Sequence, residues 1–229
     1  MDNVAQLLGL IFAELLFVTL LARFGREWLY GSILVNLALI GTLGAKTVTL
    51  LGVTTNSGNV FYASVFFATY LILEGYDRRT ALRSIPIGAV FIAFFLLMAN
   101  LVTSMQGTAE SRTIDSALQT ILTRAPRVGM ASILAFSISQ LANVYLYDAL
   151  RRWTKGAHLW FRNTASVVVA QGIDSIIFFL IAFIGLLPSA TLIQAMAVGF
   201  AMKVSVGIIS TPFLYLNRSL HLREIAHSR

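Results

Sequence analysis

The sequence predicts an all-α membrane protein, a compact bundle of seven transmembrane helices. Of its 229 residues, 57% are hydrophobic and only 12% are charged, whereas a soluble domain carries about a quarter charged residues. The mean hydropathy is +0.79, and the apolar residues come in runs of about 20, the length that crosses a bilayer as a helix. These runs are continuous rather than alternating, which argues against a β-barrel.

Seven apolar runs define the predicted spans. They cover residues 4–24, 28–51, 59–75, 85–104, 129–153, 161–185 and 188–216. The third run is short, and the seventh is long enough to tilt in the bilayer or to continue past its surface. The first run lacks the basic segment that precedes a cleaved signal sequence, because its only early charge is Asp2. We therefore expect it to remain as a membrane helix.

The segment between the fourth and fifth spans, residues 105–127, is too polar to be a further span. Its apolar residues recur at helical spacing and are Ile114, Leu118, Ile121 and Leu122. This pattern predicts a short amphipathic helix that lies on the outer leaflet of the membrane. An irregular polar loop is the alternative interpretation.

Basic residues are distributed unevenly between the two sets of loops. Twelve of the 17 Lys and Arg residues fall on alternate loops and on the C-terminal tail: Arg23, Arg26, Arg78, Arg79, Arg83, Arg151, Arg152, Lys155, Arg162, Arg218, Arg223 and Arg229. By the positive-inside rule these loops are cytoplasmic. This predicts a multi-pass membrane protein with its N-terminus outside and its C-terminus inside. The same placement explains the net charge of +7 without a nucleic-acid partner.

Polar side chains deep inside the last three spans indicate a buried site. Asp174 lies about 13 residues from the cytoplasmic end of its span, roughly 20 Å into it, and Lys203 and Gln140 lie at the same depth on neighbouring spans. An aspartate and a lysine at one level of a membrane can pair. Further hydrogen-bonding residues on these spans are Asn143, Ser166 and Gln171. The pair either orients two helices or borders a polar cavity, and these neighbours favour the cavity.

Two charged residues lie at the cytoplasmic ends of spans. Glu74 ends the third span, four residues before Arg78, a spacing typical of an ion pair on one helix face. A substrate contact is the alternative for Glu74. Arg162, at the start of the sixth span, is interpreted either as part of a substrate pathway or as an anchor to lipid headgroups.

Other residues within the spans have weaker signals. Tyr62, Phe66 and Tyr70 follow one another at four-residue spacing on the third span and could stack on a flat ligand. Packing is the commoner role of aromatic residues in membrane helices. Glu14 and Lys46 lie in the first and second spans, where they either pair or extend separately to the membrane surface.

Enzyme signatures are absent from the sequence. It contains no HExxH, no Gly-x-Ser-x-Gly, no P-loop and no Gly-rich dinucleotide fingerprint. It has no cysteine, and its three histidines, His158, His221 and His227, fall in cytoplasmic segments. We therefore predict neither enzymatic activity nor a metal or other cofactor.

Three stretches make the chain resemble the queuosine precursor transporter family, also called the vitamin-uptake-transporter-like (VUT) family. They are ASILAFSISQLANVYLYDALRR from residue 131, RNTASVVVAQGIDSIIFFLIAFIG from residue 162, and AMKVSVGIISTPFLYL from residue 201. A fourth stretch, NVFYASVFFATYLILEGYDRRTA from residue 59, resembles the third conserved block of the family. The resemblance runs from about residue 35 to residue 217.

The resemblance implies import of 7-deazaguanine precursors of queuosine, a modified tRNA base, across the inner membrane. One such precursor is 7-cyano-7-deazaguanine (preQ0). The implied fold is a six-helix core over residues 28–217, similar to the substrate-binding subunits of energy-coupling-factor vitamin transporters. An additional N-terminal helix within residues 1–27 and a cytoplasmic tail over residues 218–229 complete the single transmembrane domain.

The resemblance also implies which residues bind the substrate. Gln140, Asp174, Glu74 and Lys203 occupy positions that match the family, whereas Asn143 and Tyr70 stand where family members often have aspartate. The full predicted substrate-binding set is Gln140, Asn143, Ser166, Gln171, Asp174, Lys203, Glu74 and Tyr70. A carboxylate can accept both adjacent donors of a guanine-like edge, and an amide can pair with the remaining groups. Asp174 with Gln140 or Gln171 suits such a ligand.

The leading hypothesis is a transporter whose partners are a 7-deazapurine substrate and the lipid membrane. The alternative keeps the fold but makes the protein a substrate-binding subunit of an energy-coupling-factor-type vitamin transporter, dependent on a separate ATPase. The missing motifs disfavour an intramembrane enzyme. A non-transporting scaffold is a further hypothesis, which predicts that apolar residues can replace the polar residues within the spans. The driving force, a homo-oligomeric state and a coupling protein stay open at this point.

Overall fold

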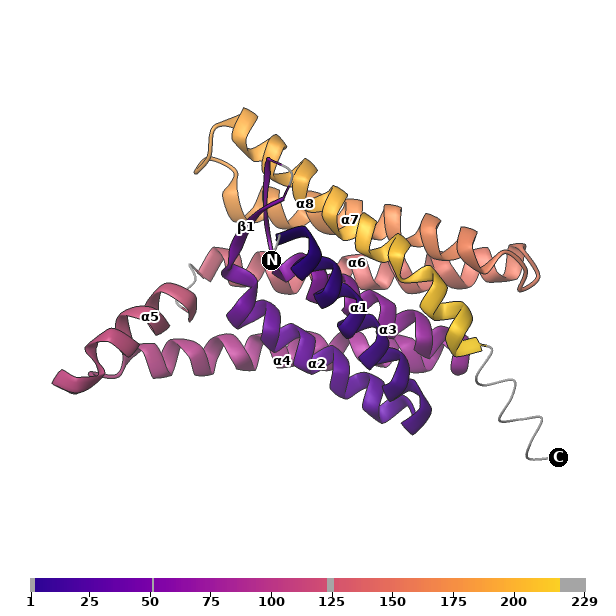
Figure 1. Cartoon of the computed structure of the whole chain (residues 1–229), viewed down its shortest axis with the longest axis horizontal. Helices are drawn as coiled ribbons and strands as arrows, with labels where there is room; N and C mark the ends of the chain where they lie inside the picture. Colours follow the sequence, from indigo (N-terminus) through magenta and orange to yellow (C-terminus); the bar gives the residue numbers. More distant parts are fainter. Residues whose placement is uncertain (1–2, 51, 123–125, 219–229) are drawn as a thin grey trace.

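The computed structural model describes residues 3–50, 52–122 and 126–218, which form a helical bundle with one short β-hairpin (Figure 1). The long helices are α1 (Asn3–Leu21), α2 (Arg26–Thr42), α3 (Gly58–Gly75), α4 (Arg78–Ser104), α6 (Pro126–Trp153), α7 (Leu159–Phe183) and α8 (Ser189–Ile209). The short elements are α5 (Arg112–Leu122), β1 (Thr47–Leu50), β2 (Val53–Asn56) and the 3₁₀ turns Ala22–Phe24, Leu43–Ala45 and Ala109–Ser111.

The protein is a helical, multi-pass membrane protein. Within the described residues, five helices are long and apolar enough to cross a membrane: α1, α4, α6, α7, and α8 with its continuation as Ser189–Arg218. Helices α2 and α3 have 17 and 18 residues, about 25 and 27 Å at 1.5 Å per residue. Both lengths approach the thickness of the hydrocarbon layer, about 30 Å.

Helix α3 forms the centre of the bundle. Fifteen of its 18 residues are buried, as expected for a helix that is apolar on nearly all sides. It packs against α1, α2, α4, α6 and α8, while α7 fits between α6 and α8. The polar residues of α3 therefore face other helices rather than lipid.

The predicted second span is wrong at its C-terminal end. Helix α2 stops at Thr42, and the last part of the predicted span 28–51 instead begins an antiparallel hairpin of β1 and β2. Strand β1 alternates threonine with apolar residues, strand β2 contains Val53, Thr54 and Thr55, and β-branched side chains favour strands over helices. Gly52 in its turn has φ of 83°, which glycine adopts at low cost. An uncharged loop was expected at 52–58, and this segment contains β2 and the first residue of α3.

The bundle has two chemically different ends (Figure 1). At the hairpin end lie the β-hairpin, α5, the α7–α8 turn and the N-terminus of α1, whose Asn3 donates to the Thr49 carbonyl at 3.2 Å. At the basic end lie the α1–α2, α3–α4 and α6–α7 turns and the C-terminal part of α8. Of the predicted cytoplasmic tail, residues 219–229 lie outside the described residues.

Helix α4 starts earlier than the predicted fourth span, and the connection from α4 to α6 contains a helix. Helix α4 begins at Arg78, seven residues before the predicted span 85–104, because Asp77 caps it by accepting from the Thr80 amide at 2.6 Å. The same hydrogen bond holds the pKa of Asp77 below its usual value. The helix predicted in the segment 105–127 is confirmed as α5, and its Ile114 is exposed.

Candidate functional site

Helices α7 and α8 bring two buried charges into direct contact. The Lys203 ammonium lies 2.6 Å from Asp174 Oδ2, and these residues are only 8% and 2% exposed. Their predicted proximity is confirmed. A pair at this distance is a charge-assisted hydrogen bond, which offsets part of the cost of burying each charge.

The second oxygen of Asp174 is also engaged by side chains. Asp174 Oδ1 accepts from the Tyr62 hydroxyl of α3 and, at 3.5 Å, from the Ser139 hydroxyl of α6. The Tyr62 ring also lies under the Lys203 ammonium, 4.5 Å from nitrogen to ring centroid, a cation–π geometry. We call Asp174, Lys203, Tyr62 and Ser139 the Asp174 cluster; it joins four helices.

A cavity of about 160 Å³ adjoins the Asp174 cluster on its hairpin side. Its walls are largely apolar and include the aromatic rings of Phe91, Phe95, Phe136 and Phe178. Its polar lining comprises Asp174, Lys203, Tyr62, Asn56, Asn59 and Ser132. Glycine is needed at the hairpin end of this cavity, because a Cβ on Gly58 would lie 3.0 Å from the Gly44 Cα. The cavity therefore combines apolar walls with a small number of polar side chains, as small-molecule binding sites do.

A chain of buried polar side chains continues from this level toward the basic end. Gln140 donates to Thr69 at 3.2 Å and accepts from Asn143 at 3.3 Å. Asn143 in turn accepts from the Tyr70 hydroxyl at 2.8 Å, and Ser166 lies 3.5 Å from that hydroxyl. We call these five residues the polar chain. Each is at most 1% exposed, so the polar chain is enclosed by the helices.

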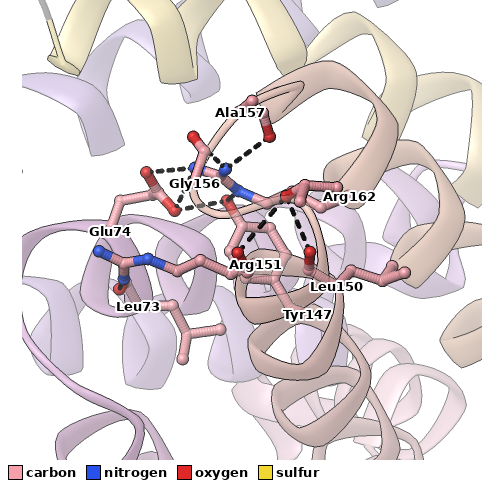
Figure 2. Close-up of polar contacts among 9 residues, drawn as sticks. Leu73, Glu74, Tyr147, Leu150, Arg151, Gly156, Ala157 and Arg162 are labelled. Atoms are coloured by element: carbon pink, nitrogen blue, oxygen red, sulfur yellow. Dashed lines mark hydrogen bonds and ion pairs between the residues drawn. The ribbon is translucent and has the colours of Figure 1, made fainter.

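A second ion pair, whose arginine is buried and whose glutamate side chain is 13% exposed, lies at the basic end. Arg162 of α7 donates to both carboxylate oxygens of Glu74 at 2.8 and 2.7 Å (Figure 2). Two interpretations from the sequence are therefore wrong. Glu74 does not pair with Arg78, which instead lies 3.2 Å from Asp148, and Arg162 is no headgroup anchor, because it is 1% exposed.

The predicted binding residues therefore fall into separate places. Asp174 and Lys203 line the cavity; Gln140, Asn143, Tyr70 and Ser166 belong to the polar chain; and Glu74 lies at the basic end. Gln140 shares the predicted depth but does not contact Asp174, because the preceding residue, Ser139, takes that position. Gln171 is buried, and its Oε1 has no hydrogen-bond partner among the described residues.

Several residues of the site were not predicted to belong to it. Asn56 and Asn59 line the cavity but lie where only a loop and a span end were expected. The aromatic spacing on α3 drew attention to Tyr62 as a stacking residue, yet its hydroxyl, not its face, meets Asp174. Glu14 accepts from Asn36 at 2.7 Å, and Lys46 is exposed beside β1, so the suggested pairing of Glu14 with Lys46 is wrong.

The arrangement suits a flat, aromatic ligand with a polar edge. Aromatic walls can stack on the faces of such a ligand, while a carboxylate, an ammonium, a phenol and two amides can pair with its edge. Within the described parts of the chain, no group of three or more His, Cys, Asp or Glu side chains is arranged to hold a metal ion.

Comparison with known proteins places the chain among transporters. The chain is 35% identical over 181 residues, 76% of each sequence, to a Bacillus subtilis (strain 168) protein named "Probable queuosine precursor transporter". It is 28% identical over 142 residues to the "Queuosine precursor transporter" of Escherichia coli (strain K12), covering 59% of this chain and 58% of that one. No solved structure matches the chain.

The sequence was also matched to protein families. The family described as "Putative vitamin uptake transporter" matches residues 56–217. This range contains the Asp174 cluster, the polar chain and the Glu74–Arg162 pair, but not α1 or α2. Because the match spans more than half of the chain, the protein belongs to the vitamin uptake transporter family and is a membrane transporter rather than an enzyme.

Proposed function

We propose that this protein imports a queuosine precursor, 7-cyano-7-deazaguanine or a related 7-deazapurine, across the cell inner membrane. The names of the two relatives support this substrate class. The observation that carries the proposal is the buried Asp174 carboxylate at the base of a cavity with aromatic walls. A deazaguanine offers the matching features, a flat ring and an edge with two adjacent donors.

Asp174 would read the donor edge of the substrate. A carboxylate has about four lone-pair positions for hydrogen bonds, and three donors of the Asp174 cluster occupy it in this structure. For two substrate donors to bind this carboxylate, at least one of the three protein donors must therefore move away from it. Ser139 has the longest contact, 3.5 Å, so it is the first donor that the substrate would displace. A ligand without adjacent donors would leave the carboxylate poorly paired, which is the basis of selectivity.

The protein is proposed to act by itself rather than as a subunit of an ATPase-driven vitamin transporter. The polar chain, which extends from the depth of Asp174 toward the basic end, supports this, since a binding subunit needs a ligand pocket but no polar residues along a route through its own helices. Purified protein reconstituted alone into liposomes should accumulate or exchange 7-cyano-7-deazaguanine. Transport that appears only after an ATPase module is added would favour the subunit.

We further propose seven membrane spans, α1 to α4 and α6 to α8, with the hairpin end outside and the basic end in the cytoplasm. The positions of the basic residues support this orientation, as do the N- and C-terminal helix ends at opposite ends of the bundle (Figure 1). In this division residues 1–27 supply an additional helix, 28–217 the six-helix core similar to energy-coupling-factor binding subunits, and 218–229 the tail. Reporter fusions that place both termini on one side would contradict it.

Uptake in a strain that cannot make queuosine precursors tests the function. The strain is supplied with 7-cyano-7-deazaguanine at low concentration, and the queuosine content of its tRNA is the readout. Expression of this protein should restore queuosine, and unlabelled 7-deazaguanines should compete with the uptake of labelled substrate. Failure to restore queuosine by a protein that is inserted in the membrane would contradict the proposal.

A further inference from the structure

Arg162 makes the largest set of contacts between helices at the basic end of the bundle. All the N–H groups of Arg162 point at acceptors: Nη2 at both Glu74 oxygens, Nε at the Tyr147 hydroxyl at 3.3 Å, and Nη1 at the carbonyls of Gly156 and Ala157 at 2.9 and 3.1 Å (Figure 2). Tyr147 also donates to Glu74 at 3.0 Å. We call Glu74, Tyr147 and Arg162 the basic-end cluster. It joins α3, α6, α7 and the α6–α7 turn.

The turn that Arg162 holds has a strained backbone. Lys155 and His158 have φ of 49° and 51°, in the left-handed region that non-glycine residues rarely adopt. Such conformations are unfavourable and persist only where surrounding contacts hold them. Between these two residues lie the carbonyls that accept from Arg162. Loss of the Arg162 contacts would therefore release both the turn and the adjacent ends of α6 and α7.

The basic-end cluster also lies between the polar chain and the basic end of the bundle. Arg162 and Asp174 are 12 residues apart on α7, about 18 Å along the helix. The polar chain lies between them, and its Ser166 donates to the Arg162 carbonyl at 2.6 Å. Beyond Ser166 toward the basic end lie the basic-end cluster, whose Arg162 is 1% exposed, and Asn163, which donates to Thr211 at 2.8 Å.

We propose that the basic-end cluster is the gate of the transport pathway at this end, and that Glu74 acts there without touching the substrate. This inference rests on the proposed transport function. In the observed state the cavity adjoins the hairpin end and the gate is closed. Release of substrate at the basic end requires the Glu74–Arg162 pair to separate, so that α3 and α7 part and the polar chain becomes accessible. Alternating exposure of one site by such rearrangements is the general mode of secondary transporters.

Thiol accessibility tests the gate without requiring a substrate. The chain has no cysteine, so Ser166→Cys introduces a single thiol into the polar chain. Labelling by a membrane-impermeant methanethiosulfonate is compared in inside-out and right-side-out vesicles. Addition of Glu74→Gln should raise the labelling rate from the basic end about tenfold or more, because a hydrogen bond to a charged group biases a two-state equilibrium by at least that factor.

Two further variants control for unrelated effects. Asp148→Asn removes a partly exposed carboxylate at the same end, paired with Arg78 and Arg152, and should leave the labelling rate within about twofold because such pairs contribute little. Tyr147→Phe keeps the Glu74–Arg162 pair and the ring volume but removes one hydroxyl. It should raise the rate by a smaller factor, and it serves as the test if Glu74→Gln does not fold.

A substrate-binding measurement distinguishes a failure of this inference from a failure of the proposed function. The affinity of purified Glu74→Gln for 7-cyano-7-deazaguanine should stay within about threefold of wild type, while its uptake falls. Unchanged labelling in the folded variants, or loss of binding in Glu74→Gln alone, would overturn the gate. Absence of binding by the wild-type protein would instead overturn the substrate assignment and leave the labelling result standing.

Discussion

Helix α7 contributes one partner to each of two buried ion pairs, and the two pairs differ in their surroundings. Asp174 faces Lys203 beside a cavity, and one of its hydrogen bonds, to Ser139, is long. Arg162 faces Glu74 in a bidentate pair with acceptors at all of its N–H groups. A ligand can replace donors that now bind Asp174, whereas every N–H group of Arg162 already has an acceptor in the protein.

This difference assigns the two ion pairs different roles: the Asp174–Lys203 pair binds substrate, and the Glu74–Arg162 pair closes the pathway. A buried charge beside a cavity can exchange its protein partners for those of a substrate at little net cost, since the total number of hydrogen bonds is kept. A charge whose hydrogen-bonding positions are all filled by the protein gains little from a ligand, and separating it from its partner is expensive. We therefore expect changes in the Asp174 cluster to impair binding and changes in the basic-end cluster to impair stability and exchange between states.

The largest effect is expected from Asp174→Asn. An amide has nearly the shape of the carboxylate, but it places an NH₂ group against the substrate donors. Two unpaired donors at about 1–3 kcal/mol each would abolish uptake, while the cation–π contact of Lys203 with Tyr62 still supports the ammonium. Uptake and melting temperature are measured side by side, with Arg112→Gln on α5 as the control of little effect. Loss of uptake explained entirely by lost protein would contradict the role of Asp174 in binding.

The next largest effect is expected on stability, from Arg162→Gln. Removing one partner of a buried, hydrogen-bonded ion pair costs about 3–5 kcal/mol, and the strained turn adjacent to it loses its support. Arg78→Gln is the matched control, because its pair with Asp148 is 38% and 21% exposed and should contribute at most about 1 kcal/mol. The free energy of unfolding of each purified variant is measured in detergent. Equal losses would show that the Arg162 network is no stronger than a surface pair.

A smaller effect is expected from Tyr62→Phe. The substitution keeps the ring under Lys203 but removes the hydroxyl that donates to Asp174 Oδ1. Loss of one hydrogen bond, about 0.5–1.5 kcal/mol, would loosen the carboxylate and lower substrate affinity by about two- to tenfold without a comparable change in melting temperature. Tyr145→Phe, on the exposed side of α6, is the control. An unchanged affinity would remove Tyr62 from the site.

The sequence was sufficient to predict the Asp174–Lys203 pair but not the neighbours of Asp174. Counting residues from the ends of α7 and α8 gives the depth of each side chain in the membrane. Two opposite charges at one depth are expected to pair, because pairing lowers the cost of placing them in the membrane. The same count placed Gln140 at that depth, yet consecutive residues on a helix differ in direction by about 100°. Ser139, not Gln140, therefore reaches Asp174, and depth alone could not show this.

The basic-end cluster was missed for a different reason. Glu74 has a local partner at helical spacing in Arg78, whereas Arg162 is 88 positions away in the sequence. Only the packing of α3 against its neighbours decides between them. The β-hairpin was missed because the hydropathy of the run 28–51 does not distinguish an apolar helix from an apolar strand. Its threonine and valine content was the local signal for β-structure.

Equilibrium binding of 7-cyano-7-deazaguanine to purified Asp174→Asn and Glu74→Gln tests the central claim most directly. Both substitutions replace a buried carboxylate with its amide, one in each ion pair, so the two variants control for each other. We predict that Asp174→Asn loses binding, while Glu74→Gln binds within about threefold of wild type. Retained binding by Asp174→Asn, together with its loss in Glu74→Gln, would contradict the assignment of recognition to Asp174 and of closure to Glu74.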